Sequence, residues 1–214
     1  MAKKSTSDFF DSYAHDFNSI YGNKKTFVTS LINKYFRKSM KLRFIKTIEG
    51  CYPIEGKSVI DIGCGPGHYS IALAKKGAKY VCAIDFAKEM INLAKENAER
   101  AGVADKCNFI FGDFMTYPIK DKFDYSIVMG FMDYINEPRK AIEKVLSITS
   151  SKAFFSFPVD RGFLAWQRKL RYKMKCDLFM YNMEQLNKLF ANFRYKSIKV
   201  EKISRDFFVA VYMR

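Results

Sequence analysis

The stretch VIDIGCGPGHYS, residues 59–70, constrains the fold more than any other part of the chain. An apolar run ends at Asp61, and Gly63, Gly65 and Gly67 then fall at alternate positions before a segment of helical composition. Glycine has no Cβ, so a loop of this kind can turn tightly and bring the backbone close to a ligand. A strand, a glycine-rich loop and a helix in this order are typical of nucleotide-binding α/β sheets.

The segments after the glycine loop alternate between short apolar runs and amphipathic stretches, which predict strands and helices respectively. Strands that are apolar on both faces are typical of a parallel sheet covered by helices on each side. We therefore expect an α/β, Rossmann-like fold with a mostly parallel sheet. The predicted strands are residues 58–62, 80–84, 108–111, 125–129 and 153–157, and the predicted helices between them are residues 68–76, 88–101 and 138–148.

The two ends of the chain differ from this alternating core. Residues 26–48 carry apolar side chains close to helical spacing, which predicts a helical N-terminal extension. Helical patterns at 163–174 and 183–190 precede two closely joined apolar runs, KSIKVEKIS and RDFFVAVYM, which predict an antiparallel hairpin and complete a seven-stranded sheet. At 214 residues we expect one domain, made of an extension or lid (1–56), a cofactor-binding core (57–160), a basic helical cap (161–192) and the C-terminal hairpin (193–214).

The net charge of +15 is concentrated in two segments. Residues 17–48 hold eight basic residues and residues 161–176 hold six, and neither segment holds an acidic residue. A positive field of this kind favours an anionic partner, such as a charged small molecule, a membrane surface or RNA. The alternative for any single residue is a solvated helix face.

Composition also bears on the compartment and on metals. The chain has no run of about 18 apolar residues and no apolar signal-peptide core at its start, so we expect a cytoplasmic protein. The five cysteines show no Cys-x-x-Cys spacing and the chain has two histidines, so we expect no metal site.

Two classes of ligand compete for the glycine loop. A dinucleotide fingerprint requires a glycine at position 68, which is His68 here, and this disfavours a nicotinamide cofactor. The segment VIDIGCGPG instead resembles the first signature of the class I S-adenosylmethionine-dependent methyltransferases, in which an acidic residue precedes Gly-x-Gly-x-Gly. The resemblance implies S-adenosyl-L-methionine as the cofactor and S-adenosyl-L-homocysteine as the product.

Three later segments resemble further signatures of the same family. YVCAIDFAKEM places Asp85 at the end of the second strand, where the family holds the ribose hydroxyls, with Phe86 and Met90 as an apolar bed for adenine. FIFGDFM and YSIVMGFMDY correspond to the sites that contact the adenine edge and the methionine portion. The resemblance implies the following cofactor-binding residues: Asp61, Gly63, Cys64, Gly65, Gly67, Asp85, Phe86, Met90, Asp113, Phe114, Met129 and Gly130, with Tyr13 and Tyr21 from an N-terminal segment that folds over the cofactor.

Methyl transfer requires above all that the acceptor is aligned with the methyl carbon, and a base is needed only when the acceptor must lose a proton. The candidates for such a base are His68, after the glycine loop, and Asp133 and Tyr134, after the fourth strand. That strand lacks the Asn/Asp-Pro-Pro-aromatic motif of many amino-methylating members.

The expected function is methyl transfer to a small or medium-sized metabolite that is anionic or lipid-linked. The first part of the chain, FFDSYAHDFNSIYG followed by a basic helix, resembles small-molecule members such as those of quinone and porphyrin pathways. The basic segments 17–48 and 161–176 would contact the anionic acceptor or a membrane surface. The alternatives are an RNA methyltransferase, which the absence of a recognisable RNA-binding module disfavours, and a non-catalytic S-adenosylmethionine-binding protein.

Overall fold

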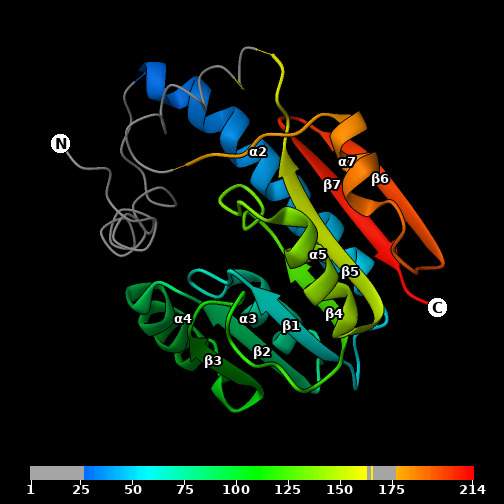
Figure 1. The fold of residues 1–214 in the computed structure, drawn as a ribbon. Helices are drawn as coiled ribbons and strands as arrows, with labels where there is room; N and C mark the ends of the chain where they lie inside the picture. Colours follow the sequence, from blue (N-terminus) through cyan, green and yellow to red (C-terminus); the bar gives the residue numbers. More distant parts are fainter. Residues whose placement is uncertain (1–26, 163–164, 166–176) are drawn as a thin grey trace.

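A computed structural model describes the backbone of residues 27–162, 165 and 177–214, with side chains from Ser39 onward. Seven strands form a single sheet in the order β3-β2-β1-β4-β5-β7-β6 (Figure 1). Strands β1 to β5 are parallel, and β7 runs antiparallel to both β5 and β6. The strands are β1 (Ser58–Ile62), β2 (Tyr80–Asp85), β3 (Cys107–Phe111), β4 (Phe123–Val128), β5 (Thr149–Pro158), β6 (Ser197–Ile203) and β7 (Asp206–Tyr212). The predicted Rossmann-like sheet with a reversed last strand is confirmed.

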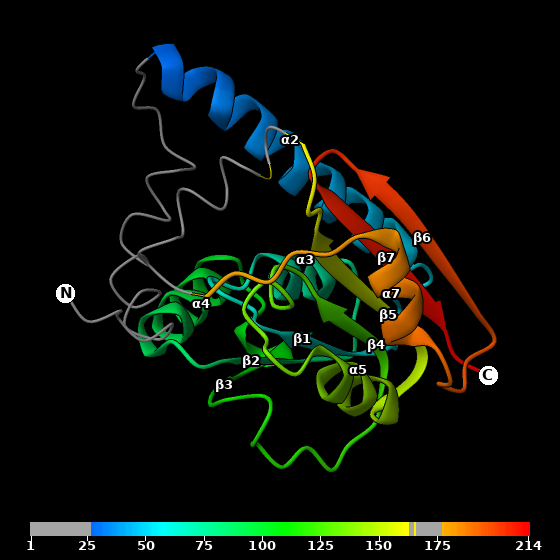
Figure 2. The ribbon, with the colours of Figure 1, turned by 45° about the horizontal axis from the view of Figure 1, so that its top comes forward.

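Helices cover both faces of this sheet (Figure 2). One face carries α2 (Phe27–Gly50), α3 (His68–Lys75) and α4 (Lys88–Arg100), and the other carries α5 (Pro138–Ser147) and α7 (Met183–Phe190). A short 3-10 helix, η1 (Ala104–Lys106), leads into β3. Within the part of the chain that the structure describes, no helix has the length and apolar character needed to span a bilayer.

The apolar strands serve two separate hydrophobic cores. Along β1, Ile60 and Ile62 pack in the core formed with α5 and α7, while Val59 packs in the core formed with α3 and α4. Successive side chains of a strand point to opposite faces, so a sheet covered on both sides needs apolar residues at consecutive positions. This requirement explains the continuous apolar runs in the sequence.

Two strands begin at least two residues before the start that the sequence pattern predicts. Strand β4 begins two residues early, at Phe123, and β5 begins four residues early, at Thr149. The added residues of β5, TSSK, are polar, but Thr149 pairs with Phe123 and Lys152 pairs with Tyr212. Backbone pairing with neighbours on both sides therefore extends this strand beyond its apolar part. The helix predicted at 163–174 lies outside the described residues.

The direction of the strands brings their ligand-facing ends to one edge. Parallel strands β1 to β5 all finish at this edge, and crevices at the carboxyl ends of such strands are where α/β sheets bind ligands. Because β7 is reversed, its first residue, Asp206, pairs with Pro158 at the end of β5. The turn between β6 and β7 therefore lies at the same edge.

Candidate functional site

The glycine loop between β1 and α3 has a left-handed backbone at each of its three glycines. Their φ angles are +67° at Gly63, +52° at Gly65 and +80° at Gly67, a region that disfavours side chains. The amides of Gly63 and Cys64 donate to the carbonyl of Ile84 on β2, at 2.9 and 3.2 Å. The loop is thereby fastened to the neighbouring strand.

The three glycines face different surroundings. A Cβ at Gly63 would lie 3.1 Å from the Phe131 ring, and a Cβ at Gly67 would lie 3.2 Å from the Ala94 methyl group. A Cβ at Gly65 would meet no atom of the protein within 4 Å. Packing alone therefore accounts for the glycines at 63 and 67, whereas Gly65 borders open space that a ligand can approach.

Asp85 joins the glycine loop to the start of α4. Asp85 is the last residue of β2 and is 8% exposed. One carboxylate oxygen accepts a hydrogen bond from the Gly65 amide at 2.8 Å, and the other accepts from the Ala87 amide at 2.9 Å. Each carboxylate oxygen can accept more than one hydrogen bond, so both remain able to accept a vicinal diol.

Asp61 has a different environment from Asp85, although both lie at the ends of adjacent strands. Asp61 is 1% exposed, and its Oδ2 accepts the Ser70 hydroxyl at 2.6 Å and the Ser70 amide at 3.2 Å. Burial raises the pKa of Asp61 to about 7, although the hydrogen bonds from Ser70 act to lower it. These contacts tie the first turn of α3 to β1, so Asp61 helps to position the glycine loop.

The raised pKa of Asp61 predicts a pH-dependent stability. Between its ordinary value of 3.8 and about 7, the folded protein binds a proton at Asp61 that the unfolded chain has released. The contribution of Asp61 to the free energy of unfolding must therefore fall as the pH rises through that window. Relative to Asp61→Asn, which cannot titrate, we expect the wild type to lose about 2–3 kcal/mol between pH 5 and pH 8. Urea unfolding of both proteins measures this, and parallel pH profiles would contradict it.

The residues predicted to contact adenine divide into three groups. At the start of α4, Phe86 is half-buried and Met90 is buried, so Phe86 is the more accessible apolar surface. After β3, Asp113 is exposed and its Oδ1 accepts the Met115 amide at 2.9 Å. Phe114 is buried, with its ring edge-on to Phe131 at a centroid distance of 5.9 Å. Phe114 thus supports the loop from the core side.

Lys144 of α5 holds the loop that carries Asp113. Its ammonium donates to the carbonyls of Phe114, Met115 and Tyr117, at 2.6, 3.2 and 2.7 Å. It also lies 5.0 Å from the centre of the Phe114 ring. The sequence pattern did not indicate this role, because Lys144 lies on a surface helix about 30 residues from the loop.

After β4, Met129 is buried, and Gly130 contacts a polar network that local motifs did not indicate. The Gly130 amide donates to the Ser156 hydroxyl at 2.8 Å, and Nη1 of Arg43 donates to the same hydroxyl at 3.1 Å. A Cβ at Gly130 would lie 3.8 Å from that Nη1 atom. Arg43 belongs to α2, so the N-terminal extension places a guanidinium beside the predicted methionine-binding position.

Asp206 at the start of β7 fixes α2 in this position. It is 1% exposed, its Oδ2 accepts the Ser39 hydroxyl at 2.5 Å, and Nε of Arg43 lies 3.7 Å from the same oxygen. Farther along α2, Lys46 pairs with Glu201 of β6 at 2.9 Å. Two of the cations in the basic segment 17–48 therefore dock α2 on the C-terminal hairpin.

The three candidate bases follow β1 and β4 at the ligand edge. His68 begins α3 and is half-buried, and burial lowers its pKa, which favours the neutral imidazole. Asp133 is 2% exposed and its carbonyl accepts the Phe179 amide at 2.8 Å, while Tyr134 is half-buried. Their roles stay predictions. Tyr13, Tyr21 and most of the basic segment 161–176 lie outside the described residues.

A reversed seventh strand, a glycine loop and a carboxylate that ends β2 define a Rossmann-like domain built to hold a nucleoside cofactor. The chain belongs to the methyltransferase domain family, whose model matches residues 54–199. The family predicted from the glycine motif is thereby confirmed.

Individual relatives agree with this assignment. The chain is similar to the ubiquinone biosynthesis O-methyltransferase of Coxiella burnetii, with 32% identity over 126 residues that cover 57% of this chain and 52% of the relative. It thus spans about half the length of that relative. Its identity to the magnesium-protoporphyrin O-methyltransferase of Rhodobacter capsulatus is 28% over 162 residues, which cover 73% of this chain and 70% of the relative.

A solved structure shares the whole fold. The magnesium protoporphyrin IX methyltransferase from Synechocystis PCC 6803, crystallised with bound SAH, superposes with a TM-score of 0.77. The superposition covers 97% of this chain and 98% of the other at 19% identity. At this identity the likeness establishes the fold alone.

Proposed function

We propose that this protein transfers a methyl group from S-adenosylmethionine to a small or medium-sized metabolite that is anionic or lipid-linked. The observation that carries the proposal is the arrangement of Asp85 across the glycine loop, next to the open space at Gly65. The relatives named above, both O-methyltransferases, support an oxygen atom as the acceptor.

The described residues fit this cofactor along the edge of the sheet. The Asp85 oxygens match the two ribose hydroxyls, and Phe86 offers an apolar face to adenine. The exposed Asp113 can accept from the exocyclic amine of the base. At the other end, the Arg43 guanidinium beside Gly130 has the charge and planar shape that suit the carboxylate of the methionine portion.

The chemistry places few demands on the protein. When bound, S-adenosylmethionine supplies an activated methyl group on a positively charged sulfur. The chain contributes by holding the ligand at the sheet edge and by orienting the acceptor oxygen. Where that oxygen carries a proton, the neutral imidazole of His68 is a suitable acceptor for it, with Asp133 and Tyr134 as further candidates.

The substitution Gly65→Ala tests the ligand-facing surface of the loop. No protein atom lies near the added Cβ, so we expect it to cost about 1 kcal/mol of stability, from the left-handed backbone. We expect S-adenosylhomocysteine to bind about tenfold more weakly, because the methyl group occupies the approach to the backbone. Gly102→Ala is a matched control, since Gly102 also has positive φ and open surroundings but lies after α4. Equal affinity in the two variants would contradict the proposed site.

The function itself is tested by a methyl-transfer assay. The purified chain, labelled S-adenosylmethionine and fractionated metabolite extract should yield a product heavier by one methyl group, detected by mass spectrometry. Bulk RNA provides the competing substrate, and methylation of RNA alone would replace the metabolite proposal. Binding of S-adenosylhomocysteine with no methylated product in any fraction would favour a non-catalytic binding protein. Thermal stabilisation by NADH, with none by S-adenosylhomocysteine, would reject the cofactor.

A further inference from the structure

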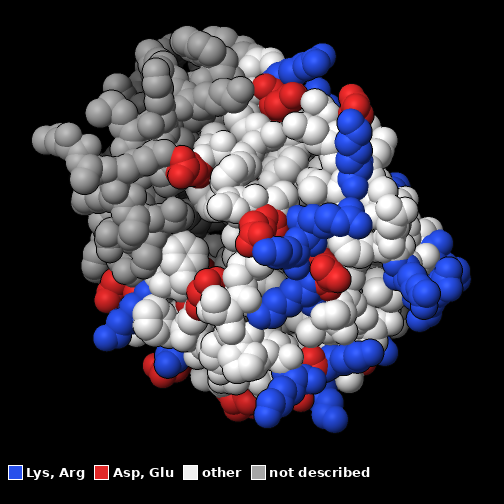
Figure 3. All heavy atoms as spheres, in the orientation of Figure 1, with Lys and Arg blue, Asp and Glu red and all other residues white. Residues whose placement is uncertain are grey.

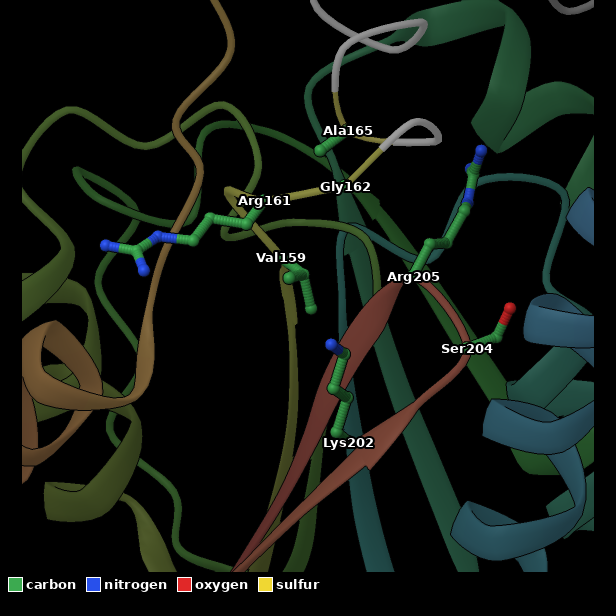
Figure 4. Close-up of a pocket in the computed structure, with 7 residues that line it drawn as sticks. All are labelled: Val159, Arg161, Gly162, Ala165, Lys202, Ser204 and Arg205. Carbon is green, nitrogen blue, oxygen red and sulfur yellow. The ribbon is translucent and has the colours of Figure 1, made fainter.

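A pocket lies at the ligand edge, away from the glycine loop. It has a volume of about 220 Å³ and lies between the end of β5 and the turn from β6 to β7 (Figure 4). Its described lining is Val159, Arg161, Gly162, Ala165, Lys202, Ser204 and Arg205. This volume is below the range of pockets that enclose a complete drug-sized ligand, so it suits one polar arm of a larger molecule.

The pocket has a clear charge preference. Three of its described lining residues are cationic and none of them is acidic. Figure 4 shows Lys202 and Arg205 rising from the hairpin, whereas Arg161 extends toward the other side. The adjacent carboxylate of Asp206 is buried and held by Ser39 and Arg43, so it opposes this positive charge only weakly. Both Lys and Arg bind carboxylate and phosphate oxygens.

One face of the described surface carries both signs of charge. Figure 3 shows Lys and Arg interspersed with Asp and Glu over the visible face of the molecule. Several described cations have acidic partners, such as Lys57 with Asp124 and Lys188 with Glu184. Among the described residues, Lys202 has no ion pair with a carboxylate. The described lining of the pocket thus contributes three cations, two of them from the hairpin turn and its approach.

The sheet order places this pocket within reach of the reacting centre. Strand β5 is next to β4, which carries Met129 and Gly130, and β7 and β6 follow in that order. Neighbouring strands are about 4.8 Å apart, so the pocket begins roughly 5 Å and extends to roughly 15 Å from the end of β4. An acceptor can therefore present its oxygen at β4 while an arm of the same molecule enters the pocket.

We propose that Lys202 and Arg205 form a recognition site for an anionic arm, a carboxylate or a phosphate, of the methyl acceptor. This inference rests on the proposed function and adds the part of the molecule that selects the acceptor. The arm is separate from the oxygen that receives the methyl group and keeps its charge during the reaction. Neutral analogues of the same acceptor are consequently poor substrates.

Two measurements on the full chain test this site. The first uses inorganic phosphate as the probe, at up to tens of millimolar, and follows the backbone amide signals of Ser204 and Arg205 by NMR. We expect these signals to shift in the wild type, about tenfold weaker phosphate binding in Lys202→Ala, and no binding in Lys202→Glu. Lys199→Ala, on the same strand but outside the pocket, is the matched control and should behave as the wild type. Absence of any shift at these amides in the wild type would overturn the site.

The second measurement uses the acceptor fraction found in the methyl-transfer assay. We expect Lys202→Ala and Arg205→Ala each to raise the acceptor KM about tenfold, while Kd for S-adenosylhomocysteine stays within about twofold. Lys202→Arg should retain most of the affinity.

Unchanged KM in both alanine variants, with methyl transfer intact, would overturn this inference and leave the proposed function standing. No methyl transfer to any metabolite would reject the function, whereas phosphate binding at the pocket would still be measurable. Phosphatase treatment of the acceptor separates the two kinds of arm, because it removes a phosphate and leaves a carboxylate intact.

Discussion

The substitution Asp85→Ala is expected to weaken S-adenosylhomocysteine binding on the order of 100-fold, which corresponds to about 2.7 kcal/mol. The carboxylate acts twice in the bound state, because it can accept the ribose hydroxyls and it already accepts the amides of Gly65 and Ala87. Hydrogen bonds to a charged group contribute about 1.5–3 kcal/mol each, and the glycine loop also loses the hydrogen bond from the Gly65 amide to Asp85. Isothermal titration calorimetry measures the change in Kd.

Two further variants separate the contributions at Asp85. Asp121→Ala removes an exposed carboxylate from the loop before β4, at the opposite edge of the sheet, and should leave the affinity unchanged. Asp85→Asn turns an amide NH₂ group toward one of the two backbone N–H donors, so we expect it to bind almost as weakly as alanine. If Asp85→Ala folds and binds within threefold of the wild type, the ribose does not lie against this residue.

The substitution Arg43→Met should produce the largest loss of stability, about 3 kcal/mol, because it leaves the carboxylate of Asp206 buried without its cation. Asp206 is 1% exposed and would keep only the Ser39 hydroxyl among the contacts described above. The Ser156 hydroxyl would also lose one of its two donors. Urea denaturation gives the free energy of unfolding, and a loss below about 1 kcal/mol would contradict a buried ion pair here.

The double variant Arg43→Met/Asp206→Asn distinguishes the structural role of Arg43 from its proposed binding role. Removing both charges relieves the buried carboxylate, so we expect most of the lost stability to return. The affinity for S-adenosylhomocysteine should remain about tenfold lower, because the neutral pair offers no cation to the ligand carboxylate. Recovery of both stability and affinity would show that Arg43 acts on the fold alone.

Local patterns were sufficient to predict most of the fold. The change from helical spacing to short apolar runs identified all seven strands, because the central strands, covered on both faces, are apolar along their centres and the edge strand β6 alternates apolar and polar residues. The polar start of β5 and the 3-10 helix before β3 were not predicted. Their structure depends on backbone pairing and on a short connection, neither of which leaves a hydrophobic pattern.

The site was predictable where it depends on neighbouring residues in the sequence. The left-handed glycines and Asp85 belong to compact motifs, and the structure places them together at one edge. Arg43 and Asp206 could not be found in this way, since 163 positions separate them and neither belongs to a motif. Similarly, Asp61 before the glycine loop holds Ser70, a structural contact that the motif alone does not indicate.

The docking of α2 on β7 has a consequence for the order in which the protein can assemble. Ser39 is 167 residues from its partner Asp206, so α2 leaves the ribosome long before β7 and cannot dock until that strand has been synthesised. The central strands can form a sheet before that moment, but the guanidinium of Arg43 reaches its place only with the final strand. A chain that stops before residue 206 should therefore keep much of its sheet and lack the contact that holds Arg43 beside Gly130.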